Sequence, residues 1–242
     1  MDYDIRVGYL EMFDIETEEN LQCGFTTTGG AKSSSGGAVS DRKVNEPKKP
    51  QSPEDGTHDV LPKNAASAVK KIQNITGMSE KDAIESARAI NSFTKFAYDD
   101  IRNLEYAGKT SPEVKAINRY LDKMPKFQGE VSRGKQFDSP EEAQIFINKM
   151  KQGAPYVLPA MSSFSSDRGT AQKFANIEKS AGVEKSTPMV LVVAANKRGV
   201  SIRSLSDVRN EDEVLVPKKT KYKLKGEPYQ KNGTWFVPLG ED

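Results

Sequence analysis

The sequence has little of the residue types that many metal and redox sites require. Among 242 residues there are one cysteine, Cys23, and one histidine, His58. A single cysteine forms no disulfide within the chain, so nothing indicates a disulfide-rich secreted scaffold. These two residues are also too few for a zinc site, and His58 lies in a polar, proline-rich stretch that argues against a histidine base. We therefore expect no metal cofactor.

Neither charge of one sign nor a long apolar run dominates the chain. Lys and Arg number 36 and Asp and Glu number 34, which gives a net charge of +2. This balance is typical of a mixed solvated surface and argues against a nucleic-acid partner, which would need a basic stripe. No apolar run approaches the roughly 20 residues that cross a membrane, and the acidic start Met-Asp-Tyr-Asp is unlike a signal peptide. We expect no membrane partner and a cytoplasmic location, unless another machine packages or delivers the protein.

Composition divides the chain into three parts. Residues 1–23 form a short N-terminal segment of unknown role, with some apolar–polar alternation. Residues 24–65 place Gly, Ser and Pro among charged residues, and have too few apolar side chains to offset the entropy of ordering them. We predict a flexible linker there, followed by one domain over residues 66–242.

Within 66–242, helical patterns come first and strand patterns later. Ser79 and Ser111 each precede a helix, and Asn91-Ser92 separates the first helix from a second amphipathic stretch that ends at Gly108. Ser139-Pro140-Glu141-Glu142 is a capping box that opens a helix to about Met150. The other predicted elements are a helix over 168–178 and strands over 127–132, 189–195, 213–216, 220–225 and 234–237, the last after a Lys231-Asn232-Gly233 turn. Helices followed by strands indicate an α+β fold with a helical N-terminal subdomain.

Arg133-Gly134 closes the predicted strand 127–132. A planar guanidinium binds phosphate with two hydrogen bonds, and a glycine lets a ligand approach the backbone. Arg-Gly also occurs at residues 168 and 198, and a surface arginine beside a turn glycine is the plainer interpretation of any one pair. The position of Arg133 at a strand end distinguishes it from the others.

Ser163-Phe164-Ser165 lies just before the predicted helix 168–178, whose Ala171 and Phe174 share one face. The plain interpretation is a loop with one capping serine. A packed helix would instead fix both hydroxyls at a sheet edge, where they can orient a carboxylate and line an amide pocket. Similar Ser-x-Ser patterns occur at residues 33–35 and 204–206.

Glu211-Asp212-Glu213 runs into the apolar segment Val214–Val216. A charged strand edge is the plain interpretation. If the strand includes all three residues, alternation places Glu211 and Glu213 on one face. Two carboxylates this close repel, which raises the pKa of one and separates their roles.

In this order, the three motifs resemble the arginine, Ser-x-Ser and Glu-x-Glu set of arginine-specific mono-ADP-ribosyltransferase toxins. The resemblance covers about residues 79–237 and is particularly to ADP-ribosyltransferase domains attached to phage minor head proteins. It is carried by Phe127-x-Gly129-Glu130-Val131-x-Arg133-Gly134, by Ser162–Ser165 with Ala171 and Phe174, and by Ser206 with Glu211-x-Glu213-Val214-Leu215-x-Pro217. It implies a two-sheet β core, NAD as substrate, no metal, and an unidentified acceptor protein modified on arginine. Residues 1–65 lie outside it and would tether the domain to a larger assembly such as a phage head.

The resemblance also implies which residues bind NAD. Arg133 would hold the phosphates, and backbone groups of Gly134 would face the nicotinamide amide. Ser163 would hydrogen-bond Glu213, and Ser165 would help line the nicotinamide side. Phe164 would either contact nicotinamide or pack in the core.

The two glutamates would carry the chemistry. Glu213 would bind the 2′-hydroxyl of the nicotinamide ribose and stabilise the positive charge that develops as nicotinamide leaves. Glu211 would orient or deprotonate the acceptor. The acceptor loop 205–210 has no aromatic residue, and the Gly-containing segment 180–187 is either a flap over NAD or a solvated connection. Two alternatives stay open: an NAD glycohydrolase, and a catalytically silent phage structural or interaction module.

Overall fold

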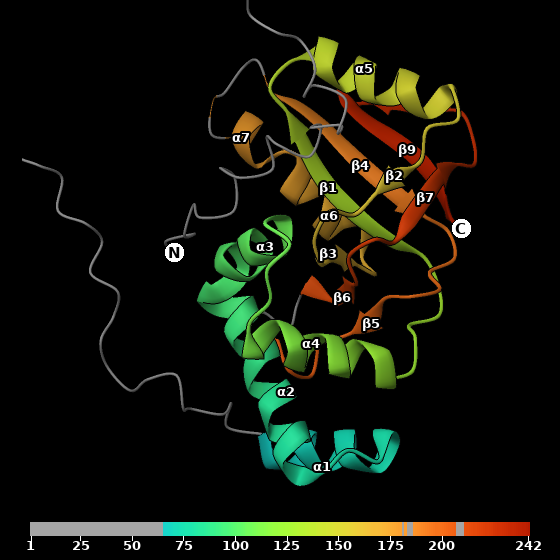
Figure 1. The fold of residues 1–242 in the computed structure, drawn as a ribbon. Helices are drawn as coiled ribbons and strands as arrows, with labels where there is room; N and C mark the ends of the chain where they lie inside the picture. The colour runs from blue at the N-terminus through green and yellow to red at the C-terminus, as the bar shows by residue number, and fades with distance from the viewer. Residues whose placement is uncertain (1–64, 181, 183–185, 207–210) are drawn as a thin grey trace, which may run out of the picture. The chain divides into compact units, whose positions relative to one another are not determined.

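The described residues are 65–180, 182, 186–206 and 211–242 in the computed structural model. All of them belong to one compact unit. A helical part comes first and a β core follows (Figure 1), which confirms the predicted α+β class. The predicted N-terminal segment and all but the last residue of the predicted linker lie outside the described residues.

The helical part begins and ends at residues with clear local causes. It consists of α1 (Ala65–Thr76), α2 (Glu80–Ser92), α3 (Tyr98–Tyr106) and α4 (Pro112–Lys123). The Ser79 hydroxyl accepts a hydrogen bond from the Asp82 amide at 3.1 Å, and Ser111 accepts one from Val114 at 3.2 Å. Gly108 adopts φ +66°, a conformation that favours glycine and ends the helix. These predicted helix boundaries are confirmed.

The predicted break at Asn91-Ser92 is wrong. The backbone continues from α2 through a π-helical turn, Phe93–Ala97, into α3. A π-turn adds one residue to the helical ladder and so changes which face the following residues present. Phe93 is completely buried in the core of the helical part. The helical pattern changes phase there, and this change resembles an interruption in the sequence.

The β core consists of two parts that meet at one residue pair. Its strands are β1 (Val131–Phe137), β2 (Tyr156–Val157), β3 (Ser162–Ser165), β4 (Thr187–Val193), β5 (Val200–Ser201), β6 (Glu213–Val216), β7 (Lys221–Leu224), β8 (Tyr229–Lys231) and β9 (Thr234–Glu241). They follow the order β2-β7-β9-β4-β1-β3-β6-β5, with β8 paired to β9. Seven residue pairs join β1 to β4, but only Ser132 and Ser165 join β1 to β3. The strands β3, β6 and β5 therefore form a second part beyond that junction (Figure 1).

Helices cover both faces of the larger part. Met189, Leu191 and Val193 of β4 belong to the core that also contains residues of α5 (Pro140–Lys151). The alternate residues Val190 and Val192 pack in the core with α6 (Arg168–Ala175). This strand is buried on both faces, which explains its continuous apolar run. A short helix, α7 (Ile177–Ser180), follows, so the helix predicted over 168–178 is in fact two helices.

The predicted hairpin turn is confirmed. Asn232 and Gly233 have φ of 51° and 77°, and Lys231 pairs with Thr234 across a two-residue turn. Positive φ at both central residues is what the tight turns of β-hairpins require.

Candidate active site

Arg133 lies inside β1 and not at the end of a strand. The strand predicted over 127–132 runs from Val131 to Phe137, because this stretch pairs along its whole length with β4. Gly129, with φ +129°, lies before it. The Arg133 side chain is 4% exposed, and its Nη1 donates a 2.9 Å hydrogen bond to the Ser163 carbonyl. A buried guanidinium thus links β1 to β3, beside the point where the two parts of the core meet.

Gly134 is required by the packing of a helix. A Cβ at this position would lie 2.3 Å from the Ala171 carbonyl oxygen and 2.5 Å from the Ala175 amide nitrogen, both in α6. The prediction attributed Gly134 to the approach of a ligand. The direction in which a side chain would project from this position instead points to α6. Among described residues, β1 has a strand partner on its β3 side only at Ser132. The Gly134 backbone on that side stays the predicted partner of the nicotinamide amide.

The two serines of Ser-x-Ser lie in β3 and not in a loop. Antiparallel pairing places Ser165 opposite Glu213 and Ser163 opposite Leu215 of β6. Alternation puts these four side chains on one face. The Ser163 hydroxyl donates to Glu213 Oε1 at 2.5 Å, so the hydrogen bond predicted between them is present. Ser163 therefore contacts two charged residues of the site, Arg133 through its carbonyl and Glu213 through its hydroxyl.

The Glu-x-Glu motif is a turn that leads into a strand. Only Glu213 belongs to β6; Asp212 has φ +48°, so strand alternation does not place Glu211, and that argument was wrong. The Ser165 hydroxyl instead donates to the Glu211 carbonyl at 2.5 Å, and the Ser166 amide donates to the Asp212 carbonyl at 3.1 Å. Ser165 thus fixes the backbone of the motif.

Burial raises the pKa of both glutamates. Glu213 is 7% exposed, and the loss of solvation raises its pKa, which hydrogen bonds from Ser163 and Ser206 partly oppose. Burial and the neighbouring charge of Glu213 raise the pKa of Glu211 to about 7. The two carboxylates are thus close enough for Glu213 to raise the pKa of Glu211, as predicted. A turn at Asp212, and not strand alternation, brings them together. Around neutral pH the half-buried Glu211 is able to accept a proton.

Phe164 packs in the core. Its ring is 2% exposed and lies 5.9 Å from the ring of Tyr222. It projects from β3 on the face opposite to Ser163, and the Arg133 guanidinium lies 5.9 Å from its ring centre. Of the two alternatives for Phe164, the structure shows packing, and the contact supports Arg133.

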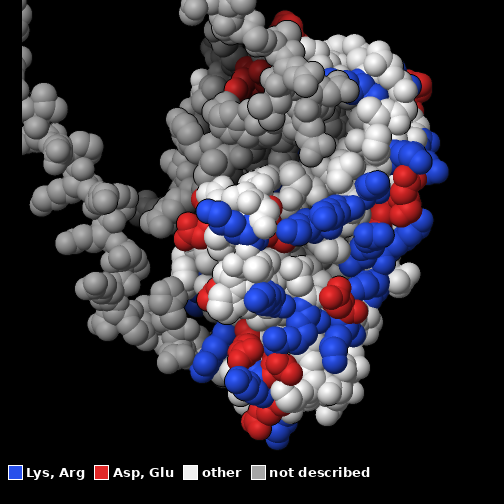
Figure 2. Space-filling model, viewed as in Figure 1, with Lys and Arg blue, Asp and Glu red and all other residues white. Residues whose placement is uncertain are grey.

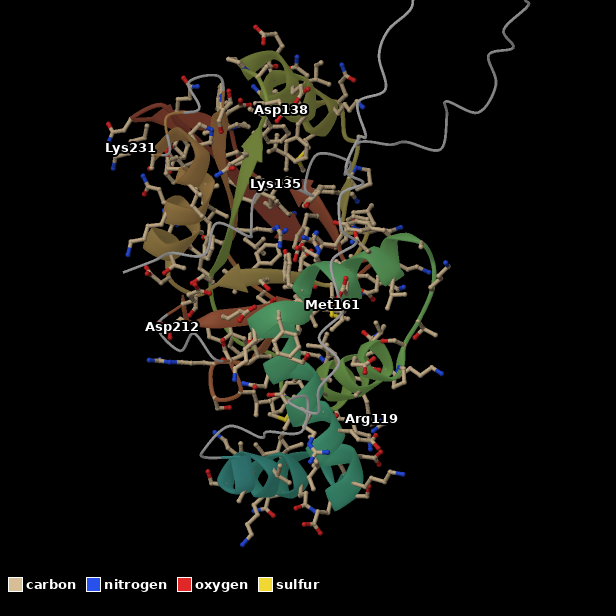
Figure 3. All side chains as sticks on the ribbon, turned by 90° about the vertical axis from the view of Figure 1, so that its left-hand side faces the viewer. Arg119, Lys135, Asp138, Met161, Asp212 and Lys231 are labelled. Carbon is tan, nitrogen blue, oxygen red and sulfur yellow. The ribbon has the colours of Figure 1, made fainter. Side chains whose placement is uncertain are left out.

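The contacts of two further residues were not predicted. Ser206 was named with the Glu-x-Glu motif and within another Ser-x-Ser pattern, but it was given no role, and its buried hydroxyl bonds Glu213. Glu105 of α3 is buried and accepts a 2.6 Å hydrogen bond from the amide of Met161. Met161, which is labelled in Figure 3, lies directly before β3. The sequence gives no sign of the second contact, because it joins residues 56 apart.

Several features bear on ligands and surfaces. In the part of the chain that the structure describes, no cluster of His, Cys, Asp or Glu is suited to a metal ion. No helix among those residues is long and apolar enough to cross a membrane. Basic and acidic side chains are interspersed on the face seen in Figure 2, and Lys223 pairs with Asp242 at 2.9 Å. Four of the six residues of the predicted acceptor loop 205–210, and four of the eight residues of the predicted flap 180–187, lie outside the described residues.

Solved structures that share this fold include three bacterial proteins. HopU1, an ADP-ribosyltransferase of Pseudomonas syringae pv. tomato DC3000, has a TM-score of 0.55 and 19% identity over 74% of this chain and 87% of that chain. The ADP-ribosyltransferase Vis, a toxin of Vibrio splendidus, has a TM-score of 0.53 and 16% identity over 74% of this chain and 82% of its own. Exoenzyme S of Pseudomonas aeruginosa, bound to carba-NAD, has a TM-score of 0.51 and 15% identity over 74% and 82%.

The fold is therefore that of the bacterial ADP-ribosyltransferases. No protein-family model and no curated protein sequence matches the chain. The likeness lies in the structure, at sequence identities below 20% for these three neighbours.

Proposed function

We propose that this protein is an NAD-dependent mono-ADP-ribosyltransferase that transfers ADP-ribose to arginine side chains of an acceptor protein and releases nicotinamide. One observation carries the proposal: Ser163 contacts Arg133 through its carbonyl and Glu213 through its hydroxyl. A cation for phosphates and a carboxylate for a developing positive charge are thus held at a fixed spacing. Such a pair is suited to hold the phosphates of NAD and to stabilise positive charge as the nicotinamide–ribose bond breaks.

The residues present fit NAD. When bound, NAD supplies a ribose whose bond to the positively charged nicotinamide is readily broken. Arg133 would bind the phosphates, since its guanidinium is permanently charged. Glu213, held by Ser163, would accept a hydrogen bond from the ribose 2′-hydroxyl and stabilise positive charge on the sugar. No step requires a metal.

Glu211 would act on the acceptor. An arginine guanidinium must lose a proton as its nitrogen bonds to the ribose carbon, and Glu211 would take that proton. Its pKa of about 7 leaves it largely ionised only above neutral pH, so transfer should increase as the pH rises through 7.

The choice of a guanidine acceptor has support from a structural neighbour. Vis has been solved in complex with agmatine, a small guanidine, with a TM-score of 0.50 to this chain and 14% identity. We propose the same acceptor chemistry here. A tether of residues 1–65 to a phage head or a comparable assembly also remains a prediction.

The proposal is tested with labelled NAD, a bacterial lysate and the variant Glu213→Gln. We expect labelled protein bands with the wild type, with agmatine competing for the label, and neither bands nor nicotinamide release with the variant. The conservative exchange keeps the side-chain volume but removes the negative charge. Glu141→Gln, an exposed glutamate of α5, is the matched control and should label as wild type does.

Other outcomes have distinct meanings. Nicotinamide release without labelled protein or labelled agmatine would indicate an NAD glycohydrolase, with water as acceptor. No release from the wild type would contradict the proposal and favour the silent interaction module.

A further inference from the structure

The turn 202–206 connects the helical part to Glu213. The Ile202 amide donates a 3.0 Å hydrogen bond to the Glu213 carbonyl. The Ile202 carbonyl in turn accepts hydrogen bonds from the amides of Leu205 and Ser206, both at 2.8 Å. Ile202 and Leu205 are buried in the core of the helical part. The turn 202–206 is therefore fixed both to the backbone of Glu213 and to the helices.

Asn91 of α2 holds the same turn from the other side. Its Nδ2 donates a 3.0 Å hydrogen bond to the Leu205 carbonyl, and the contact is buried. Asn91 is 5% exposed although it is polar, and a buried amide is retained in a core only where its hydrogen bonds are satisfied. The next residue after this carbonyl is Ser206, which is 4% exposed and bonds the Glu213 carboxylate.

We propose that Asn91 and Ser206 are positioning residues for Glu213: Asn91 fixes the turn, and the turn places the Ser206 hydroxyl against the carboxylate that Ser163 already binds. This inference rests on the proposed function for its catalytic meaning, but not for its geometry. Two hydroxyl donors on one carboxylate fix its rotamer more firmly than one. The two hydroxyl donors also favour the ionised form of Glu213. That form is the one that stabilises positive charge developing on the sugar of the substrate.

Charged groups on the elements next to Glu213 come from three places. Glu211 lies on the turn before β6 and repels Glu213. Arg133 of β1 reaches the Ser163 carbonyl. Arg203, on the turn 202–206 itself, is paired with Asp212 at 2.8 Å. Because Glu211 and Glu213 interact, pH–rate profiles report on both, and a residue-specific titration is needed.

The experiment follows the side-chain carboxyl carbon of Glu213 by NMR in protein with labelled glutamate, with the resonance assigned from Glu213→Gln. We expect Ser206→Ala to move the titration midpoint of Glu213 to higher pH, since a donor to the ionised form is lost. Ser204→Ala, an exposed serine on the same turn, is the matched control and should leave the midpoint unchanged. An unchanged midpoint in folded Ser206→Ala protein would overturn the proposal.

The role of Asn91 is tested by asking whether the effect of its substitution depends on the presence of Ser206. Asn91→Ala should shift the midpoint in the same direction, and adding it to Ser206→Ala should give no further shift. Ser86→Ala is the control, because it removes another buried bond from α2, the 3.0 Å bond of Ser86 to the Ala116 carbonyl. An equal shift with Ser86→Ala, or additive shifts in the double variant, would contradict a role of Asn91 through Ser206.

Kinetics separate this inference from the proposed function. For both positioning variants we expect kcat of nicotinamide release to fall about 10- to 100-fold with little change in KM, as misplacement of a reacting group predicts. If the wild type releases no nicotinamide, the proposed function fails while the NMR titration still decides the positioning. If Ser206→Ala keeps the wild-type kcat, the catalytic part of the inference is wrong.

Discussion

The raised pKa of Glu211, which suits the proposed role as a base, lowers the stability of the fold at neutral and higher pH. Burial and the charge of Glu213 raise its pKa from 4.5 to about 7. Between these values the unfolded chain loses a proton that the folded chain keeps, so the free energy of unfolding falls as the pH rises. Below pH 4.5 the group is neutral in both states and imposes no cost.

Glu211→Gln should therefore stabilise the protein at pH 8 by about 1–2 kcal/mol, after allowance for partial exposure. The gain should disappear near pH 4.5. Thermal unfolding of the variant and the wild type across this range is the measurement. A difference in Tm that does not change with pH would show that Glu211 is not the source.

Gly134→Ala should destabilise the fold, because the new methyl group would meet the backbone of α6 at 2.3 and 2.5 Å. Backbone atoms of a packed helix cannot move aside as a flexible side chain can, so α6 or β1 must shift. We expect a loss of about 1–3 kcal/mol, measured by chemical denaturation. An equally stable variant that no longer binds NAD would instead support the predicted contact with a ligand.

For single residues, the sequence predicts which residue types form the candidate site better than where those residues lie in the fold. Ser163 and Glu213 were paired correctly because a resemblance related their motifs. Arg133 was placed at a strand end, because the pairing of β1 depends on β4, more than 50 residues further along the chain. Ser206 was named with the Glu-x-Glu motif but its contact with Glu213 was not predicted, since only the folded turn brings the two side chains together.

Among the elements, α3 is tied to the start of β3 by one buried carboxylate. Glu105 accepts the Met161 amide at 2.6 Å, and Lys218 lies 3.7 Å from its other oxygen. Burial raises the Glu105 pKa, so its ionised form is costly. The hydrogen bond from the Met161 amide is the largest effect that opposes this cost.

We expect Glu105→Ala to lower the free energy of unfolding by about 1–3 kcal/mol, because a buried amide loses its acceptor. Glu105→Gln keeps an acceptor oxygen and should be destabilised much less. Urea denaturation of both variants is the measurement, and equal losses would mean that the ion pair with Lys218 dominates.

Element types were predicted well where local signals suffice. Serine caps, a helix-ending glycine and a two-residue hairpin turn each specify a boundary with neighbouring residues. The π-turn Phe93–Ala97 was missed because it depends on burial of Phe93 among other helices, which local sequence does not encode.

For the whole molecule, the division into segment, linker and domain is still a prediction. A chain that starts at Lys63 should unfold with the same Tm as the full chain and release nicotinamide at the same rate. Loss of cooperative unfolding would show that residues before 63 belong to the fold. Retained folding with lost labelling of protein would assign them to acceptor binding.

The place of β9 has a consequence for synthesis. This strand pairs in parallel with β4 on one side and antiparallel with β7 on the other, so Thr234–Glu241 complete the middle of the sheet and not its edge. A nascent chain that has reached residue 233 contains every residue of the candidate site, but β4 and β7 still lack their common neighbour. Because such long-range pairing forms slowly and late, the ribosome would finish this strand before the candidate site is assembled.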